Sequence, residues 1–262
     1  MKFPNIDPVA LSLGPVEIRW YGVAYVTGII LAYIYAIHIV KKKNLTITKT
    51  HLENFLSWTI IAIIVGGRLG FTLIYDPLKY LMHPIKILQI YKGGMSFHGG
   101  MIGLAFATYI YSKKYKLPFL TFIDIIAVVS PIGLFLGRIV NFINAELYGR
   151  ITDVSWGVIF PGEILPRHPS QLYEALAEGF VLLIIMSVAS LRYNTLRFPG
   201  RTSGIFLVCY SLFRIMIENF REPDEKIGFI LSYLTMGQIL SSFMFILGLY
   251  LLTIKLQSKS VR

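Results

Sequence analysis

Residues 119–142 read Phe119-Leu-Thr-Phe-Ile-Asp-Ile-Ile-Ala-Val-Val-Ser-Pro-Ile-Gly-Leu-Phe-Leu-Gly-Arg-Ile-Val-Asn-Phe142, an almost uninterrupted apolar stretch. A helix of about 20 mostly apolar residues crosses the hydrocarbon core of a bilayer. The stretch therefore predicts a transmembrane helix. Its charged residues, Asp124 and Arg138, must face protein or water, because an unpaired charge in hydrocarbon is unfavourable.

The rest of the chain has the same apolar character. Its 262 residues are 55% hydrophobic and the mean hydropathy is +0.64, which is too apolar for a soluble domain of this length. We therefore predict an all-α polytopic membrane protein with one integral-membrane domain over residues 1–262. About seven spans are expected, at residues 20–40, 55–75, 97–112, 119–142, 172–191, 203–220 and 233–254. The third and sixth are short, as expected if they end at functional, partly wet positions.

The distribution of basic residues predicts the orientation. Of the 25 lysines and arginines, 13 lie in short, nearly acid-free clusters after the first, third, fifth and seventh segments, against 9 in the other loops. Cytoplasmic loops are enriched in Lys and Arg, so we expect the N-terminus outside and the C-terminus in the cytoplasm. Loops 76–96, 143–171 and 221–232 are then external. Residues 1–19 contain three prolines and two acids, so we expect no cleavable signal peptide.

The overall charge and the single cysteine exclude several classes. A formal charge of +11 favours contact with anionic lipid over binding of nucleic acid, because a soluble nucleic-acid-binding domain would not be this apolar. Cys209 is the only cysteine, so an internal disulfide and a Cys-based metal site are excluded. Its apolar surroundings predict a small buried residue.

Three arginines interrupt the apolar stretches, namely Arg68, Arg138 and Arg214. Arg214 and Glu218 share a helix face, and Arg221 follows three residues later. This pattern fits either an internally neutralised stripe or a pair of guanidinium groups that binds a phosphate.

Polar residues also gather at the end of the fourth segment. Arg138, Asn141 and Asn144 recur every three residues along one face, and unpaired amides there would be unfavourable. A capping role and a catalytic role remain equally open for Asp124.

Two further clusters mark the starts of apolar segments. The stretch Gly93-Gly-Met-Ser-Phe-His98-Gly-Gly-Met-Ile-Gly103 surrounds one histidine with glycines, which indicates close backbone approach. The second cluster is Arg167-His168-Pro169-Ser170-Gln171-Leu172-Tyr173-Glu174. Ser170 is a candidate N-cap with Glu174 in the first turn, but capping alone would not require His168 and Gln171.

Together these residues resemble the bacterial phosphatidylglycerol–prolipoprotein diacylglyceryl transferases over nearly the whole chain. Each motif is weak alone, and their order makes the combination specific. The motifs are Arg19-Trp20-Tyr21-Gly22, Gly66-Gly67-Arg68-Leu69-Gly70, Gly93-Gly94-Met95-Ser96-Phe97-His98-Gly99-Gly100, Gly137-Arg138 to Arg150, His168 to Glu174, and Phe213-Arg214 to Pro223.

The resemblance implies transfer of the diacylglyceryl group of phosphatidylglycerol to the lipobox cysteine of exported prolipoproteins, with release of glycerol phosphate. It implies a multi-pass protein of the bacterial cytoplasmic (inner) membrane, without cofactor or metal. Arg138 matches the arginine that contacts the lipid head group. The family commonly has glycine where this chain has Ala145, a change that we expect to be tolerated. The matching positions are Tyr21, His98, Asp124, Arg138, Asn141, Glu146, Gly149, Tyr210, Arg214, Glu218 and Arg221.

The reaction needs a thiolate and a stabilised phosphate leaving group. We assign Arg138 and Arg214 to the phosphate. Asn141 and Glu146 are expected to hold the guanidinium groups and the head-group glycerol. The remaining predicted substrate-binding residues are Tyr21, Gly149, Glu218, Arg221 and Arg68.

His98 is the candidate base, with Tyr210 orienting or sharing the proton. The alternatives are that His98 only shapes its loop and that the thiol loses its proton to water or to a phosphate oxygen.

Two other classes compete with this interpretation. A transporter or flippase for an anionic lipid would also bury arginines, but it predicts an inverted repeat, and none is visible. An intramembrane protease would use a serine nucleophile with a matched histidine or a metal site with His-x-x-Glu-His spacing, and the sequence has no His-x-x-Glu-His spacing. Residues 78–91, apolar with interspersed lysines, are a candidate arm on the outer membrane surface.

Overall fold

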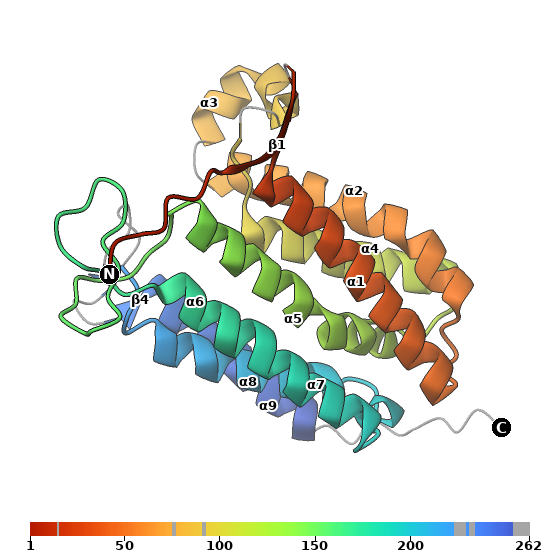
Figure 1. Cartoon of the computed structure of the whole chain (residues 1–262). Coiled ribbons are helices and arrows are strands. Elements are labelled where there is room, and N and C mark those ends of the chain that lie inside the picture. Colours follow the sequence, from red (N-terminus) through yellow and green to blue (C-terminus); the bar gives the residue numbers. More distant parts are fainter. Residues whose placement is uncertain (15, 75–76, 91–92, 223–228, 231–233, 254–262) are drawn as a thin grey trace. The chain divides into compact units, whose positions relative to one another are not determined.

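The computed structural model describes residues 1–14, 16–74, 77–90, 93–222, 229–230 and 234–253 (Figure 1). The chain forms two compact units. The first unit comprises Met1–Ala36 and Asp124–Arg262, and the second comprises Ile37–Ile123. Helices α1 (Trp20–Lys43) and α5 (Phe119–Ile143) each contribute to both units.

The first unit opens with an antiparallel hairpin of β1 (Val9–Leu13) and β2 (Val16–Arg19), which leads directly into α1. After α5, one continuous helix runs through α6 (Ser170–Glu174), the π-helical turn η3 (Ala175–Val181) and α7 (Leu182–Leu191). The short helix η4 (Thr195–Arg197) precedes α8 (Arg201–Ile217), and the strands β3 (Phe229–Ile230) and β4 (Leu234–Thr235) precede α9 (Met236–Thr253). Helices α8 and α9 pack side by side (Figure 1).

The second unit is built on the pairing of α2 (Lys49–Ile74) with α4 (Phe97–Lys114), joined through the short helices α3 (Pro77–Met82) and η1 (Pro84–Leu88). Glycines let the two long helices approach closely. A Cβ on Gly99 would lie 2.3 Å from the carbonyl oxygen of Gly66, and a Cβ on Gly103 would lie 2.4 Å from that of Ala62. Glycines on the C-terminal side of His98 therefore serve helix packing.

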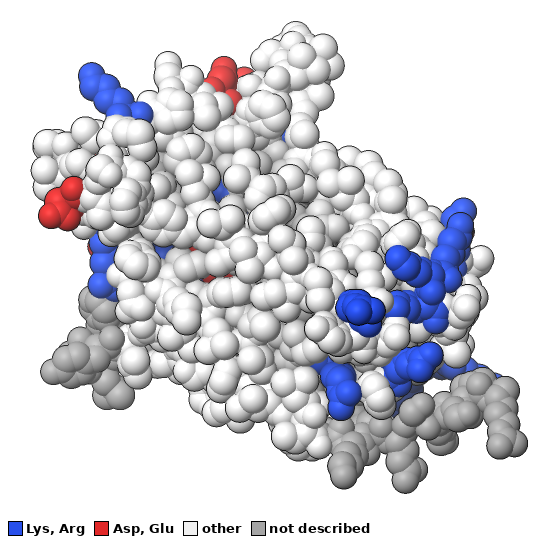
Figure 2. Space-filling view, turned by 60° about the horizontal axis from the view of Figure 1, so that its bottom comes forward, with Lys and Arg blue, Asp and Glu red and all other residues white. Residues whose placement is uncertain are grey.

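Helices occur at all seven predicted positions, with ends shifted by a few residues. Among the described residues, five are long and apolar enough to cross a membrane: α1, α2, α5, the helix Ser170–Leu191 and α9. Large apolar side chains lie exposed along them, including Tyr25, Val26 and Ile34 of α1. Most of the surface in Figure 2 carries neither basic nor acidic residues. These features are those of a helical membrane protein. The small hairpins were not predicted, because strands this short leave no periodic pattern.

Candidate functional site

Three arginines of the first unit surround one buried carboxylate. Glu174 is fully buried at the end of α6, and its oxygens contact Arg138 Nε and Arg221 Nη1. Arg214 Nη1 lies 3.5 Å from Glu174 Oε1. Arg138 comes from α5, Arg214 from α8 and Arg221 from the segment after α8, so three parts of the chain meet at this carboxylate.

Two further carboxylates complete this arginine cluster, which we define as Arg138, Arg214, Arg221, Glu174, Glu178 and Glu218. Glu218 Oε2 lies 3.1 Å from Arg214 Nε and 3.4 Å from Arg221 Nε. Glu178 Oε1 lies 3.7 Å from Arg214 Nη1. With all six groups ionised, the three positive and three negative charges cancel.

The accessible part of the cluster is cationic. The side chains of Arg138, Arg214 and Arg221 are 20%, 14% and 11% exposed. Those of Glu174 and Glu178 are 0% exposed, and that of Glu218 is 6% exposed. An anion that reaches the cluster therefore meets guanidinium groups first, with the carboxylates behind them.

Local helix geometry brings the charged groups together. Glu174 and Glu178 are four residues apart, at the junction of α6 with the π-helical turn η3. Gly179 in this turn allows close approach to α5, since a Cβ there would lie 2.6 Å from the Cβ of Phe135. Single π-helical turns occur frequently at functional sites.

A hydrogen-bonded trio adjoins the cluster. The Asn141 amide nitrogen donates to the Tyr21 hydroxyl oxygen at 2.5 Å and to Glu146 Oε1 at 2.9 Å, and the Tyr21 hydroxyl also contacts Glu146. Asn141 Oδ1 accepts from Arg138 Nη1 at 3.3 Å. Asn141 thus holds a guanidinium group as predicted. Glu146 instead contacts Tyr21 and Asn141, and Glu174, Glu178 and Glu218 accompany the arginines in its place.

The loop that carries Glu146 is fixed by the start of α6. Gln171 Nε2 donates to the carbonyl oxygen of Glu146 at 2.7 Å, and Ser170 Oγ donates to that of Leu147 at 3.2 Å. The expectation that Ser170 caps the helix was wrong: Pro169 occupies the cap position and the Ser170 hydroxyl points back to the loop. The loop backbone is left-handed at Ala145, with φ of 52°, which explains why glycine suits this position.

Gly149 lies where two backbone segments meet. Its N–H donates to the carbonyl oxygen of His168 at 2.8 Å, and a Cβ there would lie 2.2 Å from the carbonyl oxygen of Phe220. The predicted binding residue Gly149 is therefore positioned as a packing residue beside Arg221, with which it forms a β-bridge.

The loop between α5 and α6 contains His168 and Glu163, two titratable groups with shifted pKa. Burial lowers the pKa of His168, against a smaller opposing effect of Asp153, and its Nδ1 lies 3.2 Å from the Tyr173 hydroxyl oxygen. Hydrogen bonds from Arg167 and Tyr148 lower the pKa of Glu163. Neither residue contacts the arginine cluster in any interaction identified among the described residues.

Asp124 is a structural cap. Its fully buried carboxylate accepts hydrogen bonds from the backbone N–H groups of Gly200 and Ser203, both at 2.7 Å, and from Ser203 Oγ at 2.6 Å. These groups open α8, whose N-terminal N–H groups favour an anionic partner. Arg214 lies at the other end of the same helix, so Asp124 orients the helix that carries it.

Tyr210 is buried one helical turn before Arg214. Its ring stacks on Phe206 with centroids 5.8 Å apart, and its hydroxyl interacts electrostatically with Glu178 and Arg214.

The structure therefore brings together most of the predicted residues of this unit: Tyr21, Arg138, Asn141, Glu146, Tyr210, Arg214, Glu218 and Arg221.

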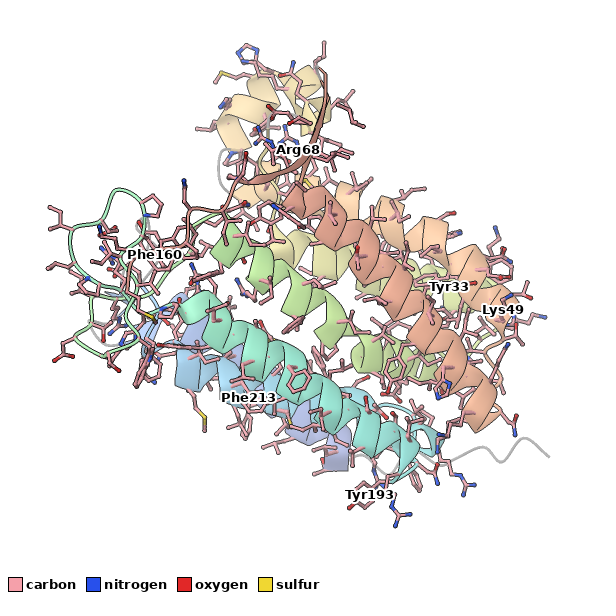
Figure 3. All side chains as sticks on the ribbon, viewed as in Figure 1. Tyr33, Lys49, Arg68, Phe160, Tyr193 and Phe213 are labelled. Atoms are coloured by element: carbon pink, nitrogen blue, oxygen red, sulfur yellow. The ribbon has the colours of Figure 1, made fainter. Side chains whose placement is uncertain are left out.

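The two remaining predicted residues, Arg68 and His98, belong to the second unit. Arg68 is 4% exposed and donates to five backbone carbonyl oxygens, of Lys86, Ile87, Gln89, Gly93 and Gly94, at 2.6 to 3.4 Å (Figure 3). These bonds use every N–H group of the guanidinium. His98 lies in the first turn of α4, and its side chain lies outside the described part of the structure.

Sequence reasoning missed the centre of the cluster. Glu174 was predicted as a first-turn acid at the end of the His168–Glu174 motif but was given no role in the site, and Glu178 was not predicted at all. The usable signal was a second acid four residues after Glu174 within an apolar span, where an ionisable side chain calls for a partner. Among the described residues, no group of His, Cys, Asp and Glu side chains is arranged to hold a metal ion.

Comparison with known proteins agrees with this picture. Residues 8–254 match the model of the family described as prolipoprotein diacylglyceryl transferase. The phosphatidylglycerol–prolipoprotein diacylglyceryl transferase of Rickettsia typhi is 57% identical over 99% of this chain and 100% of its own length. The enzymes of the same name from Rickettsia akari and Rickettsia bellii are 58% and 56% identical, over 96% and 100% of this chain and 98% and 99% of theirs. The chain therefore belongs to the prolipoprotein diacylglyceryl transferase family.

Proposed function

We propose that this protein transfers the sn-1,2-diacylglyceryl group of phosphatidylglycerol to the lipobox cysteine thiol of prolipoproteins, the first step of lipoprotein maturation. The family membership supports the reaction, and the cationic face of the arginine cluster supports the substrate class. A lipid phosphate carries the charge that this face attracts, and the planar guanidinium group matches its oxygens.

Arg138 and Arg214 bind the phosphate, with Arg221 beside them. As the bond from C3 of the diacylglyceryl group to the phosphate oxygen breaks, negative charge grows on that oxygen. Fixed guanidinium groups in a site with little water stabilise such charge without reorganising. Glu174 and Glu218 hold the guanidinium groups at the positions where the phosphate arrives.

The nucleophile is the thiolate of the substrate cysteine. Its sulfur forms the new bond to C3 as the C3–O bond breaks, and the electron pair of that bond leaves with the phosphate oxygen of glycerol phosphate. The thiol proton goes to a base, for which His98 is the candidate, because its ordinary pKa is close to ambient pH. This role for His98 rests on the resemblance and the chemistry alone.

Tyr21, Asn141 and Glu146 supply hydroxyl, amide and carboxylate groups for the hydroxyls of the head-group glycerol. Tyr210, one helical turn before Arg214, orients or shares the thiol proton. Gly149 keeps the loop and the Arg221 segment close together. Arg68 is assigned to its own loop, because its five N–H groups are already engaged by carbonyl oxygens.

The membrane arrangement completes the proposal. All seven long helices span the bacterial cytoplasmic (inner) membrane, with α4 and α8 as the shorter spans and residues 1–262 acting as one domain. The N-terminus is outside, the C-terminus is cytoplasmic, and loops 76–96, 143–171 and 221–232 are external. The basic clusters after the first, third, fifth and seventh helices support this orientation.

The test is a transfer assay with the purified full chain, phosphatidylglycerol and a synthetic peptide with a lipobox cysteine. Mass spectrometry should show the peptide gaining one diacylglyceryl group, with stoichiometric release of glycerol phosphate. A peptide whose cysteine is replaced by serine should remain unchanged. If the cysteine peptide keeps its mass while the protein moves anionic lipid between leaflets, the protein is a transporter and the proposal is wrong.

A further inference from the structure

Glu178 differs from the other two carboxylates of the arginine cluster. It is fully buried, and neither of its oxygens accepts a hydrogen bond from any described residue. Among the described residues, its one ion-pair contact is Arg214 Nη1 at 3.7 Å. Glu174, by comparison, meets three guanidinium groups, and Glu218 meets two. Of the three, Glu178 has the weakest support for a negative charge.

The groups that face Glu178 come from three parts of the first unit. Arg214 and Tyr210 approach from α8, Arg138 from α5 and Glu174 from its own helix, with Arg221 following α8. The arginines are already shared among the three carboxylates. No other described group offers Glu178 a closer positive charge.

A bound lipid phosphate changes the charge balance of this site. The empty cluster is neutral when all six groups are ionised, and the phosphate of phosphatidylglycerol adds one negative charge. An uncompensated charge in a buried site is strongly unfavourable, and carboxyl groups in such sites respond by taking up a proton. The carboxylate with the least support takes up this proton first.

We propose that Glu178 takes up one proton when the lipid phosphate binds to Arg138 and Arg214, and releases it when glycerol phosphate leaves. The proton comes from the solvent and returns to it, so no step of the transfer consumes it. Protonation turns the cluster into three positive and two negative groups, which together neutralise the phosphate. Glu178 is thus a positioning residue that acts on the substrate through Arg214.

This inference rests on the proposed function and makes binding dependent on pH. Over the range in which Glu178 of the lipid-free protein is ionised, the affinity for phosphatidylglycerol should fall about tenfold per pH unit as pH rises. A Glu178→Gln variant carries a neutral side chain at every pH. Its affinity should therefore be independent of pH over the same range and exceed that of the wild type at the alkaline end.

Calorimetry measures the proton directly. The full chain in detergent is titrated with phosphatidylglycerol at one alkaline pH, in buffers that differ in ionisation enthalpy. The dependence of the observed heat on the buffer gives the number of protons taken up, which should be about one for the wild type and about zero for Glu178→Gln. Glu178→Asp retains a carboxyl group and should retain the proton uptake. A loss of uptake in Glu178→Gln alone can then be assigned to the missing carboxyl group and not to a disturbed fold.

Glu17→Gln is the matched control, because Glu17 is an exposed carboxylate paired with Arg19 at 3.5 Å. It should take up the same number of protons as the wild type. Binding without proton uptake by the wild type, or full uptake by Glu178→Gln, overturns the role of Glu178 and leaves the proposed function intact. Failure of the wild type to bind phosphatidylglycerol contradicts both.

Discussion

Arg68 is buried and Arg214 is largely shielded from solvent, and both lie in apolar helices, yet their partners differ completely. Arg68 in the second unit donates all its N–H groups to neutral backbone carbonyls. Arg214 in the first unit is surrounded by carboxylates, and its Nη1 lacks a hydrogen-bond partner among the described residues. The first arrangement is saturated with hydrogen bonds and holds a loop, whereas in the second Nη1 is held by charge alone, 3.5 and 3.7 Å from Glu174 and Glu178.

The energetic consequences also differ. Hydrogen bonds to a charged group contribute about 1.5–3 kcal/mol each, so five of them fix η1, Gln89, Gly93 and Gly94 firmly on α2. Ion pairs in a buried cluster are offset by the desolvation of their charges, so a phosphate can replace part of these contacts at a small net free energy. Burial alone therefore does not identify an arginine that binds substrate. What identifies it is whether its N–H groups are already hydrogen-bonded within the protein.

The largest effect should come from Arg214→Lys. Lysine keeps the positive charge but loses the planar fork, so we expect kcat/KM for diacylglyceryl transfer to fall about 100-fold or more. The transfer assay with a lipobox peptide measures this, and Arg138→Lys should behave similarly. Arg192→Lys, at an exposed arginine after α7, should stay within about threefold of the wild type. Normal activity of both Arg214→Lys and Arg138→Lys would contradict the phosphate assignment.

Arg68→Lys should act on stability instead. Lysine cannot reach five carbonyl oxygens at once, so we expect a loss of about 2–4 kcal/mol in the free energy of unfolding, from several lost hydrogen bonds. Thermal unfolding in detergent measures this loss, and limited proteolysis of residues 84–94 should show the loop opening. Unchanged stability together with a higher KM for phosphatidylglycerol would place Arg68 in the substrate site, as the sequence alone predicted.

This contrast shows what the sequence could and could not predict. The apolar runs predicted the helices closely: residues 119–142 correspond to α5 at Phe119–Ile143, and residues 203–220 correspond to α8 at Arg201–Ile217. Arg68 and Arg138 both follow glycine in an apolar stretch, and the sequence could not distinguish their roles. Every residue has a backbone carbonyl, so the sequence does not show which carbonyls accept hydrogen bonds from an arginine. The partners of Arg138 were equally hidden, since Glu174 reaches it only through the packing of α6 on α5.

The spacing of polar residues carried more information than their identity. The three-residue recurrence of Arg138 and Asn141 correctly indicated that the two side chains meet. The pairing of Arg214 with Glu218 was likewise visible as a four-residue spacing. Contacts between distant segments, such as Asp124 with Ser203, depend on how helices pack and were left open.

The smallest effect should be a pH dependence of the free energy of unfolding that arises in the first unit. Burial lowers the pKa of His168 below the ordinary value of 6.5, so the folded state favours the neutral imidazole. The contribution of neutral His168 to the stability of the folded state is fully present above pH 6.5 and is lost as pH falls through the lowered pKa. Thermal unfolding between pH 7.5 and about 5.5 should therefore show a modest decrease in stability for the wild type, which His168→Gln removes.

The contacts that fix Arg68 involve neutral carbonyls, so proteolysis of residues 84–94 should not change over this range. His83→Gln, at an exposed histidine of the second unit, should keep the acid-dependent decrease. Equal pH dependence in wild type and His168→Gln would show that the acid sensitivity arises elsewhere in the molecule.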